Sequence, residues 1–259
     1  MNSNDINESS DPRDLFPTPP KHIADLEEAA LISHIKSGNF IGGHTMPWGS
    51  NYTFMMWIEV NDSDCIRVIY KPKDGEKPLY DFKNKTLYKR ERASYILSKI
   101  LGWPNIPLTI IRNGPYGLGS VQNYIECDPR ITFFEIREKN LDDLFPIAIF
   151  DLITNNADRK AGHCISDSKN VIWSIDHGLT FNSDFKLRTV MFEFCGKKIP
   201  NQFIHDISRA LTELKENQEI KKLLSSEEFA SLISRMEQII TNPMIPILNP
   251  NTDIPWPLV

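Results

Sequence analysis

The sequence predicts an α+β chain of 259 residues in two lobes, a β-rich lobe followed by a helical lobe. Four short runs rich in β-branched and aromatic residues lie in the first half, at 52–60, 65–70, 108–111 and 119–125. A single helical stripe interrupts them, between Thr86 and Leu101, with apolar residues spaced by three and four. We therefore expect a flexible segment at 1–20, the first lobe at 21–125 and the second lobe at 126–259.

The elements of the first lobe follow from local signals. Asp25 and Glu28 have the spacing of a capping box and predict a helix that ends at Gly38. The polar turn 61–64 makes a hairpin of the first two strands, with Lys71 at its exit. Gly102 ends the helix that begins near Thr86, so this lobe is a small sheet with a helix on it.

The second lobe is predicted from longer helical patterns. Apolar residues from Leu141 to Leu152 form one helical face, and Pro146 is tolerated because it lies early in that helix. A hairpin then joins 164–166 to 171–175. Two further helices are expected at 202–215 and 226–240, and the proline-rich tail should wrap the surface.

Composition excludes several classes of protein. Lys and Arg number 29 against 34 Asp and Glu, a formal charge of −5, so no basic field indicates a nucleic-acid or anionic-membrane partner. The four cysteines are scattered without a Cys-x-x-Cys pair, which favours a reducing cytoplasm. The polar first residues resemble no signal peptide, and no apolar run is long enough to span a bilayer. We expect a cytoplasmic protein without stable membrane association.

Two carboxylates eighteen positions apart carry the functional signal. Asp158 lies in a polar loop after the helix predicted to end near Leu152, and Asp176 ends the apolar run 171–175 just before His177 and Gly178. Phosphoryl transfer needs one carboxylate to orient a nucleophile and another to hold the metal that neutralises phosphates. The alternative is that both residues are only turn-forming aspartates.

Two further residues complete a minimal phosphotransfer set. Lys71 at a strand exit can neutralise nucleotide phosphates, and Glu91 on the following helix can hold that lysine. Alone, Lys71 would be read as a solvated edge charge. Glu91, between Arg90 and Arg92, would be read as one half of a surface ion pair.

The segment from Ala157 to His163 is similar to the Gly-Asp-Arg-His-x-x-Asn loop of phosphoinositide 3- and 4-kinases, and to loops of HipA-type and secretory-pathway kinases. Asp176-His177-Gly178 resembles their Asp-Phe-Gly metal motif. With the neighbourhoods of Lys71 and Glu91, the pattern most resembles a bacterial phosphoinositide-kinase-related family, over about Gly38 to Phe181.

The resemblance implies a two-lobed protein-kinase-like fold that uses ATP with Mg²⁺ or Mn²⁺. It implies Lys71 as the phosphate lysine with Glu91 as its partner, Asp158 as catalytic acid/base and Asp176 as metal ligand. Val121 to Tyr124 would be the adenine-contacting hinge, which includes Gln122, Asn123 and Tyr124.

Two positions depart from the family pattern. His163 stands where related kinases have a metal-binding asparagine, and imidazole suits manganese or zinc better than magnesium. The glycines between Gly42 and Gly49 do not spell Gly-x-Gly-x-x-Gly, so Ser50 and Asn51 are candidates to donate to phosphate instead.

Some neighbouring residues have structural interpretations. We expect Arg159 to brace its loop by pairing with a carboxylate, and Asn155 and Asn156 to cap the preceding helix. His177 is expected to be packed or hydrogen-bonded, and Cys164 to behave as a small buried hydrophobe.

Three functions stay open at this point. The first is an ATP-dependent phosphotransferase acting on a hydroxyl of a protein or small molecule. A lipid acceptor is less favoured, because 179–200 offers only four basic residues. The second is a non-catalytic nucleotide-binding pseudokinase. The third is a metal-dependent hydrolase built from Asp158, His163, Asp176 and His177, which would need neither Lys71 nor Glu91.

Overall fold

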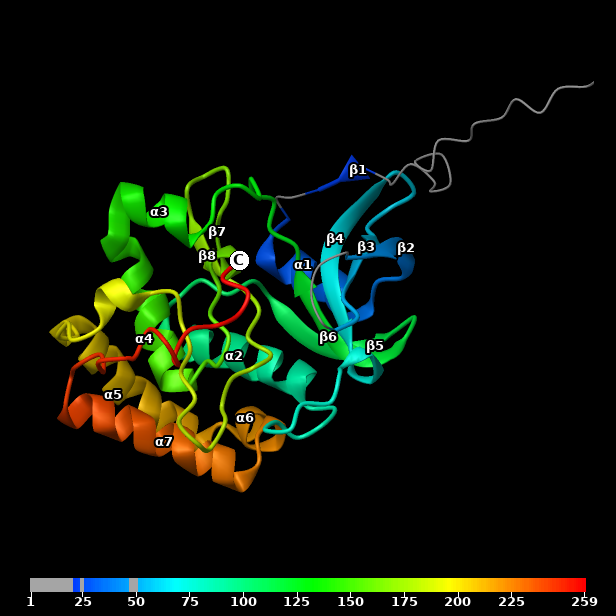
Figure 1. Ribbon diagram of the computed structural model, residues 1–259. Coiled ribbons are helices and arrows are strands. Elements are labelled where there is room, and N and C mark those ends of the chain that lie inside the picture. The colour runs from blue at the N-terminus through cyan, green and yellow to red at the C-terminus, as the bar shows by residue number, and fades with distance from the viewer. Residues whose placement is uncertain (1–20, 24–25, 47–50) are drawn as a thin grey trace, which may run out of the picture.

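The computed structural model describes residues 21–23, 26–46 and 51–259, and Figure 1 shows them as a twisted sheet beside a layered group of helices. The first lobe contains β1 (Lys21–His22), α1 (Glu28–Ser37), β2 (Phe40–Thr45), β3 (Phe54–Glu59), β4 (Asp64–Pro72), α2 (Leu87–Leu101), β5 (Thr109–Gly114) and β6 (Gly117–Asn123). After it come α3 (Phe133–Asn140), α4 (Phe145–Thr154), β7 (Cys164–Ser166), β8 (Ile172–Ser174), α5 (Asn201–Glu216), α6 (Gln218–Leu223) and α7 (Ser226–Thr241). The expected two-lobed α+β class is confirmed.

The sheet of the first lobe has the order β2-β3-β4-β6-β5, and β1 pairs in parallel with β4. Successive residues of a strand point to opposite faces. On β4, Val68 and Tyr70 therefore enter an apolar core with Ile35 of α1, whereas Ile69 and Lys71 face the cleft between the lobes. The strand thus delivers Lys71 to the cleft.

Helix α2 connects the two lobes. Its apolar stripe, with Ala93, Leu97 and Leu101, belongs to the same buried core as the helices of the second lobe. It packs against α5 and β5 and ends, as expected, at Gly102, whose φ of 91° is left-handed. Because α2 is held on both sides, residues on its cleft-facing side have fixed positions.

Helix α4 starts later than the sequence pattern indicated. Residues Leu141–Leu144 form a separate 3-10 turn, and α4 begins at Phe145 with Pro146 in its first turn. A proline there loses no hydrogen bond, because the first helical N–H groups have no partner within the helix. Asn155 ends α4 with a left-handed φ of 54°, so the expected asparagine cap is confirmed.

Sequence patterns missed β1, β2, α3 and α6. In β2, Gly42 and Gly43 read as punctuation, yet both pair with β3. A Cβ on Gly42 would lie 2.7 Å from the ring of Trp57, so close strand packing requires glycine there. Asp25, the predicted cap of the first helix, lies outside the described residues.

The tail after α7 follows the surface of the second lobe, as expected from its prolines. Its carbonyl groups accept hydrogen bonds from Ile199 (to Pro243, 2.7 Å) and from Ala161 (to Leu258, 2.8 Å). The second bond ties the tail to the loop that carries Asp158. Within the described ranges, no helix has both the length and the apolar character needed to cross a bilayer.

Candidate functional site

The cleft between the lobes brings together the four residues singled out by the sequence. Lys71 Nζ lies 2.5 Å from Glu91 Oε1 and 2.9 Å from Asp176 Oδ1, and Asp158 lines the same cavity of about 450 Å³. The Lys71–Glu91 ion pair is therefore formed, and Lys71 points toward Asp176.

Glu91 is buried rather than exposed. Only 2% of its surface is accessible, and its second oxygen accepts a hydrogen bond from the backbone N–H of His177 at 3.1 Å. Burial raises the pKa of Glu91, and the Lys71 ammonium opposes that shift. The carboxylate thus links the strand that carries Lys71 to the turn that carries Asp176.

The loop that carries Asp158 is held by a buried network that starts on α4. Asp151 accepts two hydrogen bonds from the guanidinium of Arg159, at 2.7 and 2.8 Å, and one from Asn156 Nδ2 at 2.9 Å. Asn156 Oδ1 in turn accepts from the backbone N–H of Asp158 at 3.0 Å. The expected bracing role of Arg159 is confirmed, with Asp151 as a partner that the sequence did not reveal.

Arg159 also joins the two functional loops. Its Nη1 donates to the carbonyl oxygens of His163 and Ile175, at 3.1 and 3.0 Å. Its Nη2 lies 3.1 Å from His177 Nε2. One guanidinium therefore fixes the segment after Asp158 against the segment before Asp176.

Asp158 has a basic neighbour that the sequence interpretation did not single out. Lys160 Nζ lies 3.1 Å from Asp158 Oδ2, and both side chains line the cleft. Burial raises the pKa of Asp158 to about 6, while Lys160 opposes the rise. A carboxylate with that pKa is suited to accept a proton near neutral pH. The only sign of this pairing in the sequence is that Lys160 follows Asp158 by two positions.

Asp176 has the opposite electrostatic environment. Burial by itself would raise its pKa, but the ion pair with the Lys71 ammonium, together with the adjacent imidazole of His163, outweighs burial and holds the pKa well below its usual range. Its backbone has a φ of 58°, in the left-handed region that is uncommon for aspartate and frequent at functional sites. Asp176 is therefore a permanently charged oxygen donor.

His163 contacts Asp176 directly, with Nε2 at 3.4 Å from Oδ2. Burial lowers the pKa of His163 to about 4, so the ring is neutral at pH 7. The backbone N–H of Lys160 donates to Nδ1 at 3.4 Å, which leaves the proton on Nε2 and directs it toward Asp176. To ligate a metal through Nε2, this ring would have to transfer that proton to Nδ1.

The remaining predicted residues divide into three groups. Asn51, Gln122 and Tyr124 line the cleft. Asn123 lies in the wall of a different cavity, because strand alternation turns it to the other face of β6. Ser50 lies outside the described residues.

His177 and Cys164 have the structural positions expected of them. His177 is fully buried, with Nε2 also 3.0 Å from Ser174 Oγ. Burial raises the pKa of the Cys164 thiol to about 12, which makes it inert.

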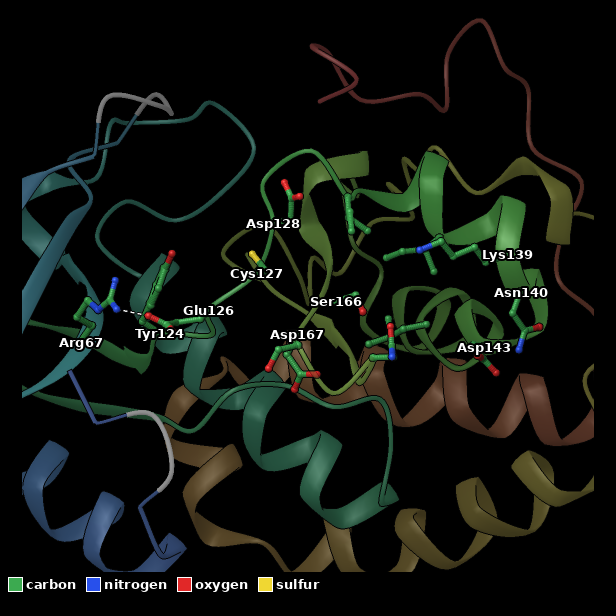
Figure 2. Close-up of a pocket in the computed structure, with 15 residues that line it drawn as sticks. Arg67, Tyr124, Glu126, Cys127, Asp128, Lys139, Asn140, Asp143, Ser166 and Asp167 are labelled. Carbon is green, nitrogen blue, oxygen red and sulfur yellow. Dashed lines mark hydrogen bonds and ion pairs between the residues drawn. The ribbon is translucent and has the colours of Figure 1, made fainter. Parts of the chain in front are cut away.

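A larger cavity, about 750 Å³, lies outside the segment that joins the lobes (Figure 2). Figure 2 shows Tyr124, Cys127 and Asp167 around it, with Lys139 and Asp143 on the far side. It shares Tyr124, Cys127 and Ile131 with the cleft but contains none of Lys71, Glu91, Asp158 and Asp176. The cleft between the lobes is therefore the better candidate for the active site, because it holds these residues.

The donor set of the cleft fits a divalent metal that arrives with a nucleotide. Among the described residues, no three His, Cys, Asp or Glu side chains are grouped as a complete metal site. Magnesium in nucleotide sites is commonly held by one or two carboxylates plus substrate phosphates. Asp176, with His163 or Asp158 nearby, matches that pattern better than the closed ligand set of a structural metal.

The chain has an atypical kinase-like fold. Similar solved structures are the Golgi casein kinase (TM-score 0.51, 13% identity, covering 82% of this chain and 73% of that one) and the same kinase with Mn and ADP bound (0.54, 14%, 82% and 74%). Hydra Fam20 with sugar is also similar (0.52, 12%, 81% and 86%). At these identities the similarity establishes the fold alone.

No family model matches the chain. Protein Rv2133c of Mycobacterium tuberculosis is 30% identical, over 74% of this chain and 82% of that protein. The chain belongs to the family of that protein. Of the kinase types that the sequence resembles, these solved structures belong to the secretory-pathway type. The resemblances to phosphoinositide kinases and to HipA remain predictions from the sequence.

Proposed function

We propose that this protein is an ATP-dependent phosphotransferase that transfers the terminal phosphoryl group of ATP to a hydroxyl. The observation that carries the proposal is Lys71, held at 2.5 Å from Glu91 and 2.9 Å from Asp176 in a cleft that also contains Asp158. The Mn and ADP bound to the Golgi casein kinase of similar fold support the choice of ATP with Mg²⁺ or Mn²⁺.

In the proposed mechanism, Lys71 binds the phosphates and Glu91 keeps its ammonium in place. Asp158 accepts the proton of the acceptor hydroxyl as its oxygen bonds to the terminal phosphorus, and the bond to the ADP oxygen breaks. Lys160, 3.1 Å from Asp158, lies where it can offset charge on the transferring group. A divalent metal, held by Asp176, would supply charge neutralisation for the phosphates when bound.

The geometry favours this proposal over a metal-dependent hydrolase. Such an enzyme would need His177 at the metal, whereas His177 is fully buried and its Nε2 faces Arg159 and Ser174. The hydrolase would also leave the Lys71–Glu91 pair, whose carboxylate is buried, without a role. A non-catalytic pseudokinase keeps that pair, and only turnover separates it from an enzyme.

For the acceptor we propose a protein or small-molecule hydroxyl rather than a lipid. Of the four basic residues after the metal motif, Lys186 is 3.4 Å from Asp81, and the Lys197 ammonium lies over the ring of Phe194. Both cations are engaged within the chain, which leaves little positive charge for an inositol phosphate. A cytoplasmic setting stays part of the proposal.

The test is incubation with ATP labelled in the terminal phosphate, offered to the protein itself and to panels of proteins, metabolites and lipids. We expect metal-dependent transfer to a protein or metabolite, and none in Asp158→Asn. Nucleotide binding without hydrolysis or transfer to any acceptor would instead identify a pseudokinase. No metal-dependent nucleotide binding would overturn the nucleotide assignment altogether.

A further inference from the structure

A small cavity of about 150 Å³ lies where the first turns of α2 meet the junction of α6 and α7. Figure 1 shows α6 beneath α2, on the side away from the sheet. The cavity is lined by charged and hydroxyl-bearing side chains that include Lys83, Lys89, Arg90, Lys222, Ser225 and Glu228. We call it the α2–α6 cavity. Four of these side chains are cations and one is an anion, in a chain whose formal charge is −5.

Three of the cations are uncompensated. Lys83, Lys89 and Lys222 form no ion pair with any described residue, although basic neighbours do. Lys85 is 2.6 Å from Asp74, and Arg92 is 2.8 Å from Glu219. Acidic partners are thus available around this region, yet of the four cations that line the cavity only Arg90 has one, Glu228.

Arg90 supplies a second, independent observation. It is only 2% exposed, its Nη1 donates to the carbonyl oxygen of Thr180, and its Nη2 pairs with Glu228. Its Nε is buried and has no acceptor among the described residues. The guanidinium lies over the ring of Phe82, 5.0 Å from its centroid, but a ring face does not replace an oxygen acceptor in the guanidinium plane.

We propose that the α2–α6 cavity binds a phosphate group. A tetrahedral oxyanion with about two negative charges accepts hydrogen bonds from several directions, as this ring of ammonium and guanidinium groups requires. The exposed hydroxyl of Ser225, which caps α7, adds a further donor. A single carboxylate would leave more of the positive charge unmatched.

Binding of phosphate in this cavity would affect the cleft through Arg90. Arg90 precedes Glu91 on α2, and its bond to Thr180 reaches the segment two residues after Gly178. A phosphate group that fixes Arg90 would therefore fix α2 against the turn that carries Asp176. The binding site itself is independent of the proposed phosphotransfer and is testable without ATP.

The experiment is isothermal titration of the full chain with inorganic diphosphate, at low ionic strength and without divalent metal. We expect Lys89→Glu combined with Lys222→Glu to weaken binding at least tenfold. Lys139→Glu combined with Lys198→Glu, the same charge change at exposed positions elsewhere, should alter it less than twofold. Because Lys71 is proposed to bind nucleotide phosphates, Lys71→Met measures the part of the titration that belongs to the cleft. Unchanged binding in the Lys89, Lys222 variant, or an equal loss in the Lys139, Lys198 control, would overturn the proposal.

A second arm identifies the source of the phosphate group. After incubation with ATP, peptide mass spectrometry would show whether the Ser225 hydroxyl has itself been phosphorylated. Phosphate on Ser225 that blocks diphosphate binding would make the chain its own source, whereas binding to an unmodified chain points to a free phosphate compound. Absence of both diphosphate binding and a modified Ser225 would refute the site.

Discussion

The loop around Asp158 and the turn around Asp176 place two carboxylates in one cleft and give them opposite properties. Asp158 is half-buried beside one cation, Lys160, and loss of solvent contact raises its pKa to about 6. Asp176 lies between Lys71 and the ring of His163, and its pKa is held far below the usual range. When environments separate the pKa values of two acids in this way, the one with the raised pKa is suited to proton transfer. The other is suited to bind a cation.

The largest effect is expected from substitution of Asp158, the carboxylate with the raised pKa. Asp158→Asn should lower phosphoryl transfer by roughly 10²- to 10⁴-fold, because an amide cannot accept the proton of the acceptor hydroxyl. Single-turnover transfer from labelled ATP measures it. Turnover within threefold of the wild type would show that Asp158 is not the base.

The second largest effect is expected on stability, when the Lys71–Glu91 ion pair beside Asp176 is broken. Glu91→Gln leaves Lys71 less compensated and weakens the acceptor for the His177 N–H, so unfolding should become easier by about 3 kcal/mol. The matched control is Glu237→Gln, which breaks the exposed Lys215–Glu237 pair of 3.0 Å and should cost less than about 1 kcal/mol. Denaturant unfolding compares them. Equal losses would mean that burial of Glu91 adds nothing.

The raised pKa predicts a pH dependence with a definite sign. Only ionised Asp158 can accept a proton, so kcat/KM should rise about tenfold between pH 5 and pH 7, with a midpoint near 6. Nucleotide binding over the same range is the control, since phosphate groups also titrate there. A rate that is flat through pH 6 while binding is also flat would contradict the assignment.

Ionisation of Asp158 should lower the stability of the folded protein, whereas ionisation of a carboxylate in a favourable ion pair raises it. A folded pKa raised above the unfolded value means that the contribution is fully present at low pH and is lost as pH rises through about 6. Asp158→Asn should therefore be more stable than the wild type at pH 8, by about 1–2 kcal/mol after allowance for partial solvent access. The difference should disappear below pH 4, as pH-dependent unfolding would show.

His163 gives the smallest and most discriminating effect. If its Nε2 ligates metal, the wild type should prefer manganese, and His163→Asn should shift the activity ratio a few-fold toward magnesium. If Nε2 keeps its proton and donates to Asp176, the substitution should lower activity equally with both metals. A ratio of manganese to magnesium activity that does not change in His163→Asn would rule out ligation.

The order of residues along the chain was sufficient to predict which four side chains meet in the cleft. Lys71, Glu91, Asp158 and Asp176 were recognised because a kinase-like fold places them in that sequence. The burial of Glu91 was not predictable, since Arg90 and Arg92 beside it are typical of a solvated helix face. Only tertiary packing shows that Arg90 is buried as well.

Other parts of the fold depend on partners that local patterns do not contain. Gly42 and Gly43 form part of β2 because β3 packs closely against them, and nothing in the local run indicates a strand. Asp151 and Arg159 are eight positions apart, so their pairing requires the turn at Asn155 to fold α4 back on its loop.

The difference between the two acids is tested most directly by metal-dependent binding of ATP to Asp158→Asn and Asp176→Ala. Ligand at a hundredfold excess over its dissociation constant stabilises a folded protein by about 2.7 kcal/mol, which thermal unfolding detects as a shift of several degrees. We predict that Asp158→Asn keeps this shift with Mg²⁺ or Mn²⁺ while losing transfer, and that Asp176→Ala loses most of it. Equal shifts in the two variants, whether both retained or both lost, would contradict the division of labour.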